Sequence, residues 1–252
     1  MKKTKLESSL AKTLRRSDLS NTLMELGELG IDELLPEVVS KIPVLGTIQS
    51  VCKIWGTVSD HLFAEKMLRF LRNLGDVSVD IRESELHDMD DDSHSERVSL
   101  HLLMVIEKTT RLQKIDLIAN AYRGYLEGSV DREELFSFTH LIDVIEISLL
   151  EHLKDFYVSN KQPNYPTLLA QDDLLQRLLA VGLVSMEYAF QREVLVSDSE
   201  EVHYGEINGG ELRILTNDLG SRFLQVVCQT NISDIKHSPS FKAYDRGSYC
   251  RQ

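Results

Sequence analysis

Residues 42–74 read IPVLGTIQSVCKIWGTVSDHLFAEKMLRFLRNL, and this stretch decides the fold class. Between Ile42 and Val58 the only charged side chain is Lys53. After residue 60, large apolar side chains recur every three or four positions, at Phe63, Met67, Phe70, Leu71 and Leu74. This period is typical of α-helices that bury one face. The stretch therefore predicts helices that pack in the core of a mainly α-helical protein.

The same helical period continues toward the C-terminus. We expect one long helix or two abutting helices over residues 97–127, ended by Gly124 and Gly128. Asp131 stands three residues before Glu134, which is the spacing of an N-terminal capping box. It predicts a helix from about residue 132 to residue 158. We therefore assign residues 1–160 to an N-terminal helical bundle domain.

Composition limits the class of protein. Of 252 residues, 42% are hydrophobic and 27% are charged, and the net charge is −12. Such a chain has enough apolar residues for a core, and its acidic balance disfavours non-specific nucleic-acid binding. The three cysteines are far apart and form no CxxC pair, so neither a zinc site nor a disulfide framework is expected. The basic N-terminus lacks the apolar region of a secretory signal, and we expect a cytoplasmic protein.

The composition changes after residue 160. A connector with two prolines precedes an expected helix over 168–180, which Gly182 ends. An expected strand over 183–188, a polar hairpin and a return strand over 212–216 follow, and Asn217 then caps a final helix. This order, closed by LTNDLGSRFLQVV, resembles the wing and following helix of winged-helix domains. The resemblance implies a small α/β winged-helix-like domain over 161–230, with a polar tail over 231–252.

The helix that would face a partner in a winged-helix domain carries one cation. Its surface positions are Gln171, Asp172, Asp173, Gln176 and Arg177. Residues 165–229 hold ten acidic side chains and four basic ones. DNA readers place cations on the helix that enters the groove. We therefore expect this domain to contact protein, and nucleic acid is not favoured; a winged-helix DNA-binding regulator is the alternative.

The apolar 42–58 segment is a candidate interaction or membrane segment. Its candidate residues are Ile42, Val44, Leu45, Ile48, Val51, Ile54 and Trp55. At this length it is marginal for spanning a bilayer. The basic helix expected over residues 1–20 would lie on anionic lipid if the segment were released from the core. A core helix of a soluble bundle is the preferred interpretation, and a membrane-perturbing effector is the alternative.

The sequence shows no catalytic motif. HExxH, GxSxG, P-loop and GxGxxG patterns do not occur. His140, Asp143 and Glu146 follow one another at helical spacing, which helix surfaces produce often. The acidic residues 83–96 predict a solvated loop between helices. We therefore predict no catalytic, cofactor-binding or metal-binding residue and do not expect an enzyme.

Three stretches together resemble a poorly characterised family of bacterial and prophage helical proteins. They are residues 42–74, the stretch RLQKIDLIANAYRGYLEGSVDREELFSFTHLIDVI at 111–145, and the pair GLV at 182–184 and LTNDLG at 215–220. Members of this family often lie near phage-defence genes. The resemblance implies a non-catalytic interaction or effector component of an anti-phage defence or toxin-like system. Its partner would be another protein or a second copy of the chain.

Overall fold

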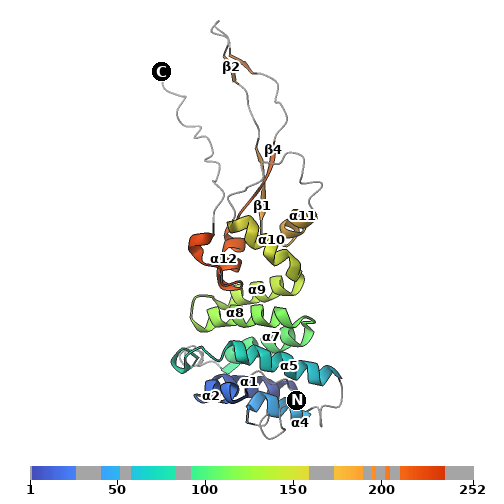
Figure 1. The fold of residues 1–252 in the computed structure, drawn as a ribbon, viewed down its shortest axis with the longest axis vertical. Helices are drawn as coiled ribbons and strands as arrows, with labels where there is room; N and C mark the ends of the chain where they lie inside the picture. Colours follow the sequence, from blue (N-terminus) through green and yellow to red (C-terminus); the bar gives the residue numbers. More distant parts are fainter. Residues whose placement is uncertain are drawn as a thin grey trace. The chain divides into compact units, whose positions relative to one another are not determined.

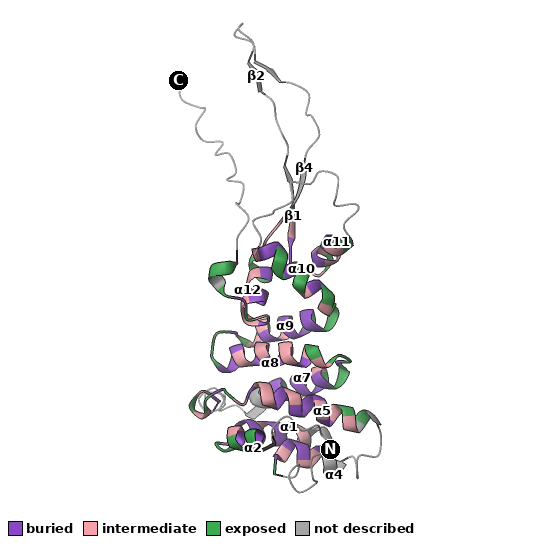
Figure 2. Cartoon of the chain, in the orientation of Figure 1, coloured by how far each residue is buried: buried purple, intermediate pink, exposed green. Residues whose placement is uncertain are grey.

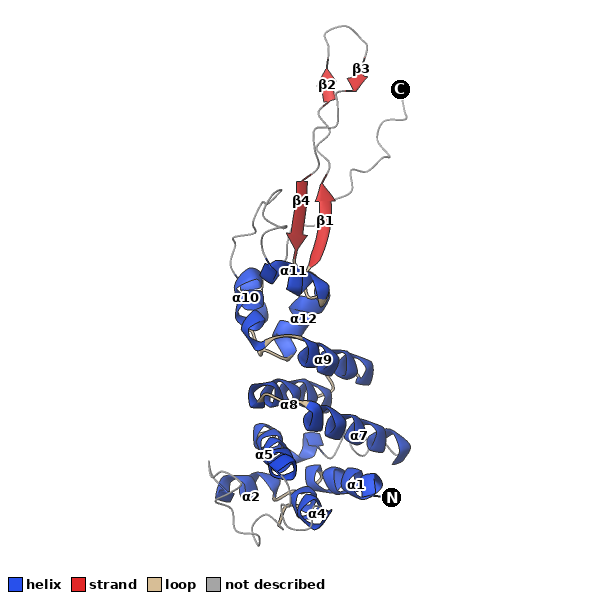
Figure 3. Ribbon diagram, turned by 90° about the vertical axis from the view of Figure 1, so that its right-hand side faces the viewer, coloured by secondary structure: helices blue, strands red, loops and turns tan. Residues whose placement is uncertain are grey.

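The computed structural model describes residues 2–26, 41–51, 58–82, 92–158, 173–189, 194–196, 202–204 and 211–235. The described chain is mainly helical, which confirms the expected fold class at this level (Figures 1 and 3). It divides into two compact units. The first comprises Met1–Ile147 together with Val226–Gln229, and the second comprises Ser148–Gln225 together with Thr230–Gln252.

The first unit is built from layered helices. Their bounds are Lys2–Leu14 (α1), Leu19–Leu26 (α2), Pro43–Val51 (α4), Val58–Asn73 (α5), Asp92–Lys108 (α7), Leu112–Leu126 (α8) and Arg132–Val144 (α9). Helix α1 packs on α4 and α7, while α5 packs on α2, α4, α7 and α8. Helix α9 packs on α7 and α8. Figure 2 shows the buried faces of these helices turned toward one another within the unit.

Hydrogen bonds between helices fix their directions. The hydroxyl of Ser9 bonds that of Thr47 at 2.7 Å, and the hydroxyl of Thr13 accepts from the Val44 amide at 3.0 Å. Helices α1 and α4 are therefore antiparallel, and Thr13 serves as an N-terminal cap for α4 from outside that helix. Helices α8 and α9 form a second antiparallel pair across a short turn. There Gly128 takes a φ of 68°, which a glycine adopts without a steric penalty.

The described part of the second unit combines helices with two short antiparallel strand pairs; the β1–β4 pair is here called the β-ribbon. Its elements are Ile147–Val158 (α10), Asp173–Ala180 (α11), Ser185–Ala189 (β1), Val194–Val196 (β2), Val202–Tyr204 (β3), Glu211–Leu215 (β4), Asp218–Val226 (α12) and the short 3-10 helix Ile232–Asp234 (η2). Strand β1 pairs antiparallel with β4, and β2 pairs antiparallel with β3 (Figure 3). The expected order of helix, strand, hairpin, strand and helix is present, with Gly182 at a φ of 77° after α11.

The phenol of Tyr157 on α10 holds the second unit together. It is fully buried, donates to the Leu183 carbonyl at 2.6 Å and accepts from the Asn217 amide at 2.9 Å. Asn217 caps α12 as expected, because its side-chain oxygen accepts from the Gly220 amide at 2.7 Å. A side chain at Gly220 would lie 2.1 Å from the Leu183 carbonyl, so only glycine fits there. Burial raises the pKa of Tyr157 to about 12.

Three features differ from the sequence-based expectation. The helix expected over 132–158 is interrupted at Ile145, whose φ of −72° and ψ of 141° are extended. Helix α10 then joins the second unit, so the division falls after Ile147 and not after residue 160. The acidic loop expected over 83–96 ends earlier, because α7 begins at Asp92. Acidic side chains in a first helical turn are stabilised by the helix dipole. Residues 83–91 lie outside the described part of the chain.

Replacing Tyr157 with phenylalanine should lower the free energy of unfolding by about 1–3 kcal/mol, because the buried Asn217 amide loses its acceptor. Urea unfolding followed by circular dichroism measures the change. In the native protein, stability should also fall as the pH rises above about 10, since the unfolded phenol ionises there and the folded one does not. Equal stability of the two proteins up to pH about 12 would show that the hydroxyl contributes nothing.

Candidate functional site

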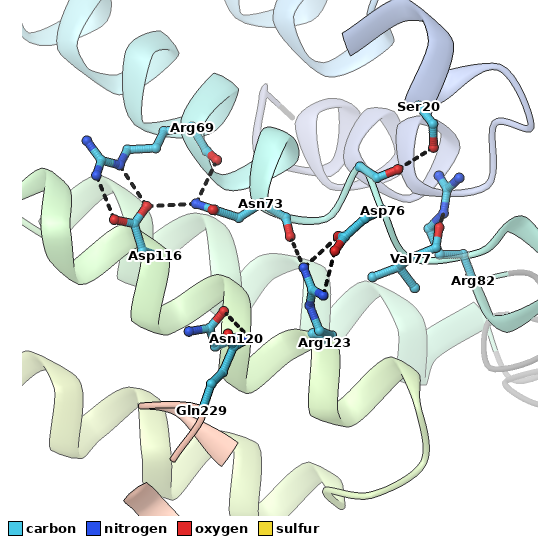
Figure 4. Close-up of polar contacts among 11 residues, drawn as sticks. Ser20, Arg69, Asn73, Asp76, Val77, Arg82, Asp116, Asn120, Arg123 and Gln229 are labelled. Atoms are coloured by element: carbon cyan, nitrogen blue, oxygen red, sulfur yellow. Dashed lines mark hydrogen bonds and ion pairs between the residues drawn. The ribbon is translucent and has the colours of Figure 1, made fainter. Parts of the chain in front are cut away.

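A row of polar side chains lies where α5 and α8 run side by side (Figure 4). Helix α5 supplies Arg69 and Asn73, with Asp76 just beyond its end, and α8 supplies Asp116, Asn120 and Arg123. Both sets have the spacing i, i+4, i+7, which places each on one helical face. The row joins α5 to α8 through charged and polar side chains.

Each charge in this row faces an opposite charge. The guanidinium of Arg69 donates to both carboxylate oxygens of Asp116, at 2.7 and 2.6 Å. Arg123 binds the Asp76 carboxylate in the same two-pronged way, at 2.8 and 2.6 Å. That contact lowers the pKa of Asp76, chiefly through the hydrogen bond. Because Arg69 meets Asp116 and Asp76 meets Arg123, α5 and α8 run in the same direction.

Arg123 also binds the C-terminal end of another helix, and this type of contact recurs in the first unit. Its guanidinium donates to the carbonyl of Asn73, the last residue of α5. The ammonium of Lys66 on α5 donates to the Glu107 carbonyl at the end of α7, at 3.0 Å. Likewise, the ammonium of Lys114 on α8 donates to the Asp143 carbonyl at the end of α9, at 2.6 Å. The last carbonyls of a helix lack amide partners and carry partial negative charge, so cations stabilise them.

Arg82 closes the end of α1 in the same way and is completely buried. One terminal nitrogen donates to the carbonyls of Leu14 and Arg16, at 3.1 and 3.3 Å, and the Nε donates to the Val77 carbonyl at 3.1 Å. Figure 4 shows Arg82 together with Val77. A buried cation is tolerated only where hydrogen bonds replace its hydration. Arg82 therefore ties the end of α1 to the segment that follows α5.

The two lysines that close helix ends are partly withdrawn from water. Burial lowers the pKa of Lys66, and the nearby Glu107 opposes this shift. Burial also lowers the pKa of Lys114, against the attraction of Asp143 and Glu146. A lysine with a lowered pKa is sometimes a nucleophile or a base. Here each ammonium is directed at a backbone carbonyl, so both lysines serve as helix caps.

The segment after α12 is held on α8 by Asn120. The Asn120 side chain donates to the Val227 carbonyl at 2.9 Å and accepts from the Gln229 amide group at 3.0 Å (Figure 4). Gln229 has a φ of 52°, an unusual value for a residue other than glycine. Asn120 therefore uses both ends of its amide to fix residues 226–229 within the first unit.

One histidine occupies a defined environment. His101 on α7 lies 4.2 Å from Phe136 on α9, centroid to centroid, and its Nε2 lies 2.7 Å from the Thr139 hydroxyl. The Thr139 hydroxyl also lies 3.0 Å from the Phe136 carbonyl, to which it can donate while accepting from a protonated Nε2. Burial lowers the pKa of His101. The contact joins α7 to α9 and has no acidic group in hydrogen-bonding range among the described residues.

The residues singled out from the sequence fall in different places. Of the 42–58 candidates, Ile42, Val44, Leu45 and Ile48 are at most 2% exposed in the first unit. The side chains of Val51, Ile54 and Trp55 lie outside the described part, as do Gln171 and Asp172. On α11, Asp173 and Gln176 are exposed, and Arg177 pairs with Asp173 at 3.6 Å. The two candidate groups belong to different compact units.

The described residues contain neither a membrane-spanning helix nor a cluster of metal ligands. No helix among them is both long enough and apolar enough to cross a bilayer. In the same part of the chain, no three His, Cys, Asp or Glu side chains are grouped so that they could hold a metal ion. The contacts that the structure shows have a structural role: basic side chains and side-chain amides hold the helices to one another.

Replacing Arg82 with methionine should lower the free energy of unfolding by about 3 kcal/mol or more, because buried carbonyls lose a charged donor. Arg82→Lys keeps the charge but cannot reach all three carbonyls, so its loss should be intermediate. Arg97→Met, at an exposed position on α7, is the matched control and should change stability by about 0.5 kcal/mol or less. Urea unfolding measures all three. Equal stability of Arg82→Met and Arg97→Met would contradict the assignment.

Acidification should weaken the α7–α9 contact through His101. Because the folded pKa is below the unfolded value of about 6.5, the unfolded chain binds more protons, and stability falls as the pH drops below that value. His101→Gln should reduce this slope, as glutamine keeps a donor but does not titrate. Midpoints of urea unfolding across the acidic range measure it. Parallel curves for the two proteins would mean that His101 is not a source of the pH dependence.

A scan against protein-family models, a search of curated proteins and a search of solved structures each found no match for this chain.

Proposed function

We propose that this chain is a non-catalytic protein-interaction component whose partner is another protein or a second copy of itself. The observation that carries the proposal is the open β-ribbon of the second unit. Strand β1 pairs with β4, and no third strand pairs with either one among the residues that the structure describes. Open strand edges present unpaired amide and carbonyl groups that readily take a further strand.

An exposed apolar side chain lies on this ribbon. Met186 on β1 is 51% exposed, whereas its cross-strand neighbour Ile214 is 4% exposed. A two-stranded ribbon is marginally stable without further packing. A partner that covers Met186 and extends the ribbon would supply that packing. Methionine is enriched in protein interfaces because its flexible thioether adapts to irregular surfaces.

The helix before the ribbon supports protein contact over DNA contact. We propose that the second unit is a winged-helix-like domain, on the strength of its element order. Its facing helix α11 exposes Asp173 and Gln176, and its single cation Arg177 is drawn to Asp173 on the same helix. Phosphate contacts by such a helix would require free cations. A DNA-binding regulator is therefore the weaker candidate.

Burial of the 42–48 residues weighs against the membrane-perturbing alternative. Four apolar side chains, Ile42, Val44, Leu45 and Ile48, would have to leave the core. Exposing each one costs about 1.5–3 kcal/mol. Their release would consume most of the stability of an ordinary domain, about 5–15 kcal/mol. A core role for α4 agrees with this balance.

The family resemblance supplies the biological setting of the proposal. The setting is proposed from sequence patterns alone: the stretches 42–74, 111–145, 182–184 and 215–220, which we compared above with bacterial and prophage helical proteins often near phage-defence genes. We therefore place the chain as an interaction or effector component of an anti-phage defence or toxin-like system. Several helix ends of the first unit are closed by cations of neighbouring helices, a construction suited to a rigid scaffold.

Size-exclusion chromatography with light scattering should give a mass above the 28.7 kDa of one chain, or a complex when the partner protein is added. Met186→Glu should weaken that association about tenfold or more, because a carboxylate would be buried at the ribbon. Met24→Glu is the matched control, since Met24 is 78% exposed on α2 and lies in the other unit. A strict monomer that binds no protein, or equal effects of the two variants, would overturn the proposal.

A further inference from the structure

Three lysines are exposed on α1 and at the residue just before Ile42 and α4. Lys5, Lys12 and Lys41, here called the lysine patch, are all exposed. Lys5 and Lys12 are seven residues apart on α1, which places them on one face about 10 Å apart. Lys41 lies at the far end of α1, because the Arg16 side chain bonds its carbonyl.

Among the described side chains, the acids nearest to these lysines on α1 and just after it do not pair with the lysine patch. Glu7 on α1 is only 6% exposed, and Asp18 is already paired with Arg16. In the part of the chain that the structure describes, the three ammonium groups make neither ion pairs nor hydrogen bonds. Other cations of the first unit behave differently: Lys66, Arg82, Lys114 and Arg123 are directed inward at helix ends. The lysine patch is thus available to an external anion.

The net charge of −12 belongs to the whole chain and includes acids that lie far from α1. At physiological ionic strength, exposed charges are screened beyond about 8 Å. Helix layers are about 8–10 Å apart, and α8 and α9 with their acidic turn lie beyond α5 and α7 in the first unit (Figure 1). Acids there, such as Glu127 and Glu133, are more than a screening length from α1.

We propose that the lysine patch is a docking surface for anionic phospholipid headgroups at a membrane surface. The chemistry of the patch selects this partner. Lysine is depleted in protein interfaces, where aromatic residues and arginine provide the anchors. Recognition of nucleic acid favours arginine forks and aromatic stacking, and neither α1 nor α4 contains an aromatic residue. Rows of lysine on a helix surface are attracted to diffuse anionic lipid without further contacts.

The contact leaves the fold intact. The apolar side of α1 is already used, since Leu10 and Leu14 are at most 1% exposed and the helix packs on α4 and α7. No apolar face of α1 is left to insert between lipid chains, so the association is electrostatic, reversible and sensitive to salt. The lysine patch belongs to the first unit and the β-ribbon to the second.

Cosedimentation of the full chain with phosphatidylcholine vesicles, with and without phosphatidylserine, tests the proposal. The chain should bind only the vesicles with phosphatidylserine, and raised salt should release it. The triple variant Lys5→Gln, Lys12→Gln, Lys41→Gln should bind on the order of a hundredfold more weakly, at about fivefold for each lysine. The matched control is Lys108→Gln, Arg111→Gln, Lys154→Gln, which has the same net charge but alters exposed cations elsewhere and should bind like the native chain.

Several results would overturn the proposal. The first is that the native chain does not bind vesicles at low salt. The second is that both triple variants lose the same amount of vesicle binding. The third is that the chain binds vesicles without phosphatidylserine and salt does not release it. Tighter binding of the same lysines to poly-glutamate or to duplex DNA, measured by fluorescence anisotropy, would replace lipid with an acidic protein or a nucleic acid. Circular dichroism of each variant verifies folding, which surface substitutions of this kind leave within about 0.5 kcal/mol.

Discussion

Closure of helix C-termini by basic side chains from neighbouring helices is the interaction on which the first unit depends. In a continuing helix, each backbone carbonyl accepts from the amide four residues on. Here the carbonyls of Leu14, Asn73, Glu107 and Asp143 accept from arginine or lysine side chains of other helices. One contact thereby does two things: it ends a helix and attaches it to its neighbour. Layer order in the unit follows from these attachments together with the apolar faces between them.

Local sequence rules predicted the helix boundaries that local chemistry decides. Asp131 caps α9, Asn217 caps α12, and Gly128 and Gly182 take the left-handed conformation after α8 and α11. Apolar periodicity likewise placed Ile42–Ile48 in the core. These features depend on residues within one turn of each other, so a single sequence contains the information.

Boundaries set by distant side chains were not predictable in this way. No glycine or proline stands at Ile145, yet α9 ends there, where Lys114 takes the Asp143 carbonyl. Over residues 97–127 the sequence left one helix or two abutting helices open; two form, and Lys66 contacts the Glu107 carbonyl beside the break. No residue pattern around position 82 predicts that the Arg82 side chain is buried. Its one sequence signal is indirect, since α1 ends at Leu14 without glycine or proline and so needs a donor from elsewhere.

The binding of basic side chains to helix ends also affects which groups are exposed to a partner. Lysines and arginines that bind helix ends are not available to an external ligand. The polar row between α5 and α8 is complete in itself, with Arg69 on Asp116 and Arg123 on Asp76. Two features of the described chain have no partner among its described residues. They are the edges of the β-ribbon and the lysine patch near α1, and they differ in chemistry. An interaction protein built on a rigid helical scaffold agrees with both.

Hydrogen exchange of side-chain nitrogens, measured by NMR, tests the central claim most directly. Arginine Nε protons and lysine ammonium protons exchange fast in water and slowly when they are hydrogen-bonded and buried. The account predicts slow exchange for Arg82 and Lys66, and fast exchange for the exposed Arg97 and Lys108 on the same protein. If Arg82 exchanged as fast as Arg97, its guanidinium would not be held at the end of α1, and closure of helix ends by cations would not be what organises this unit.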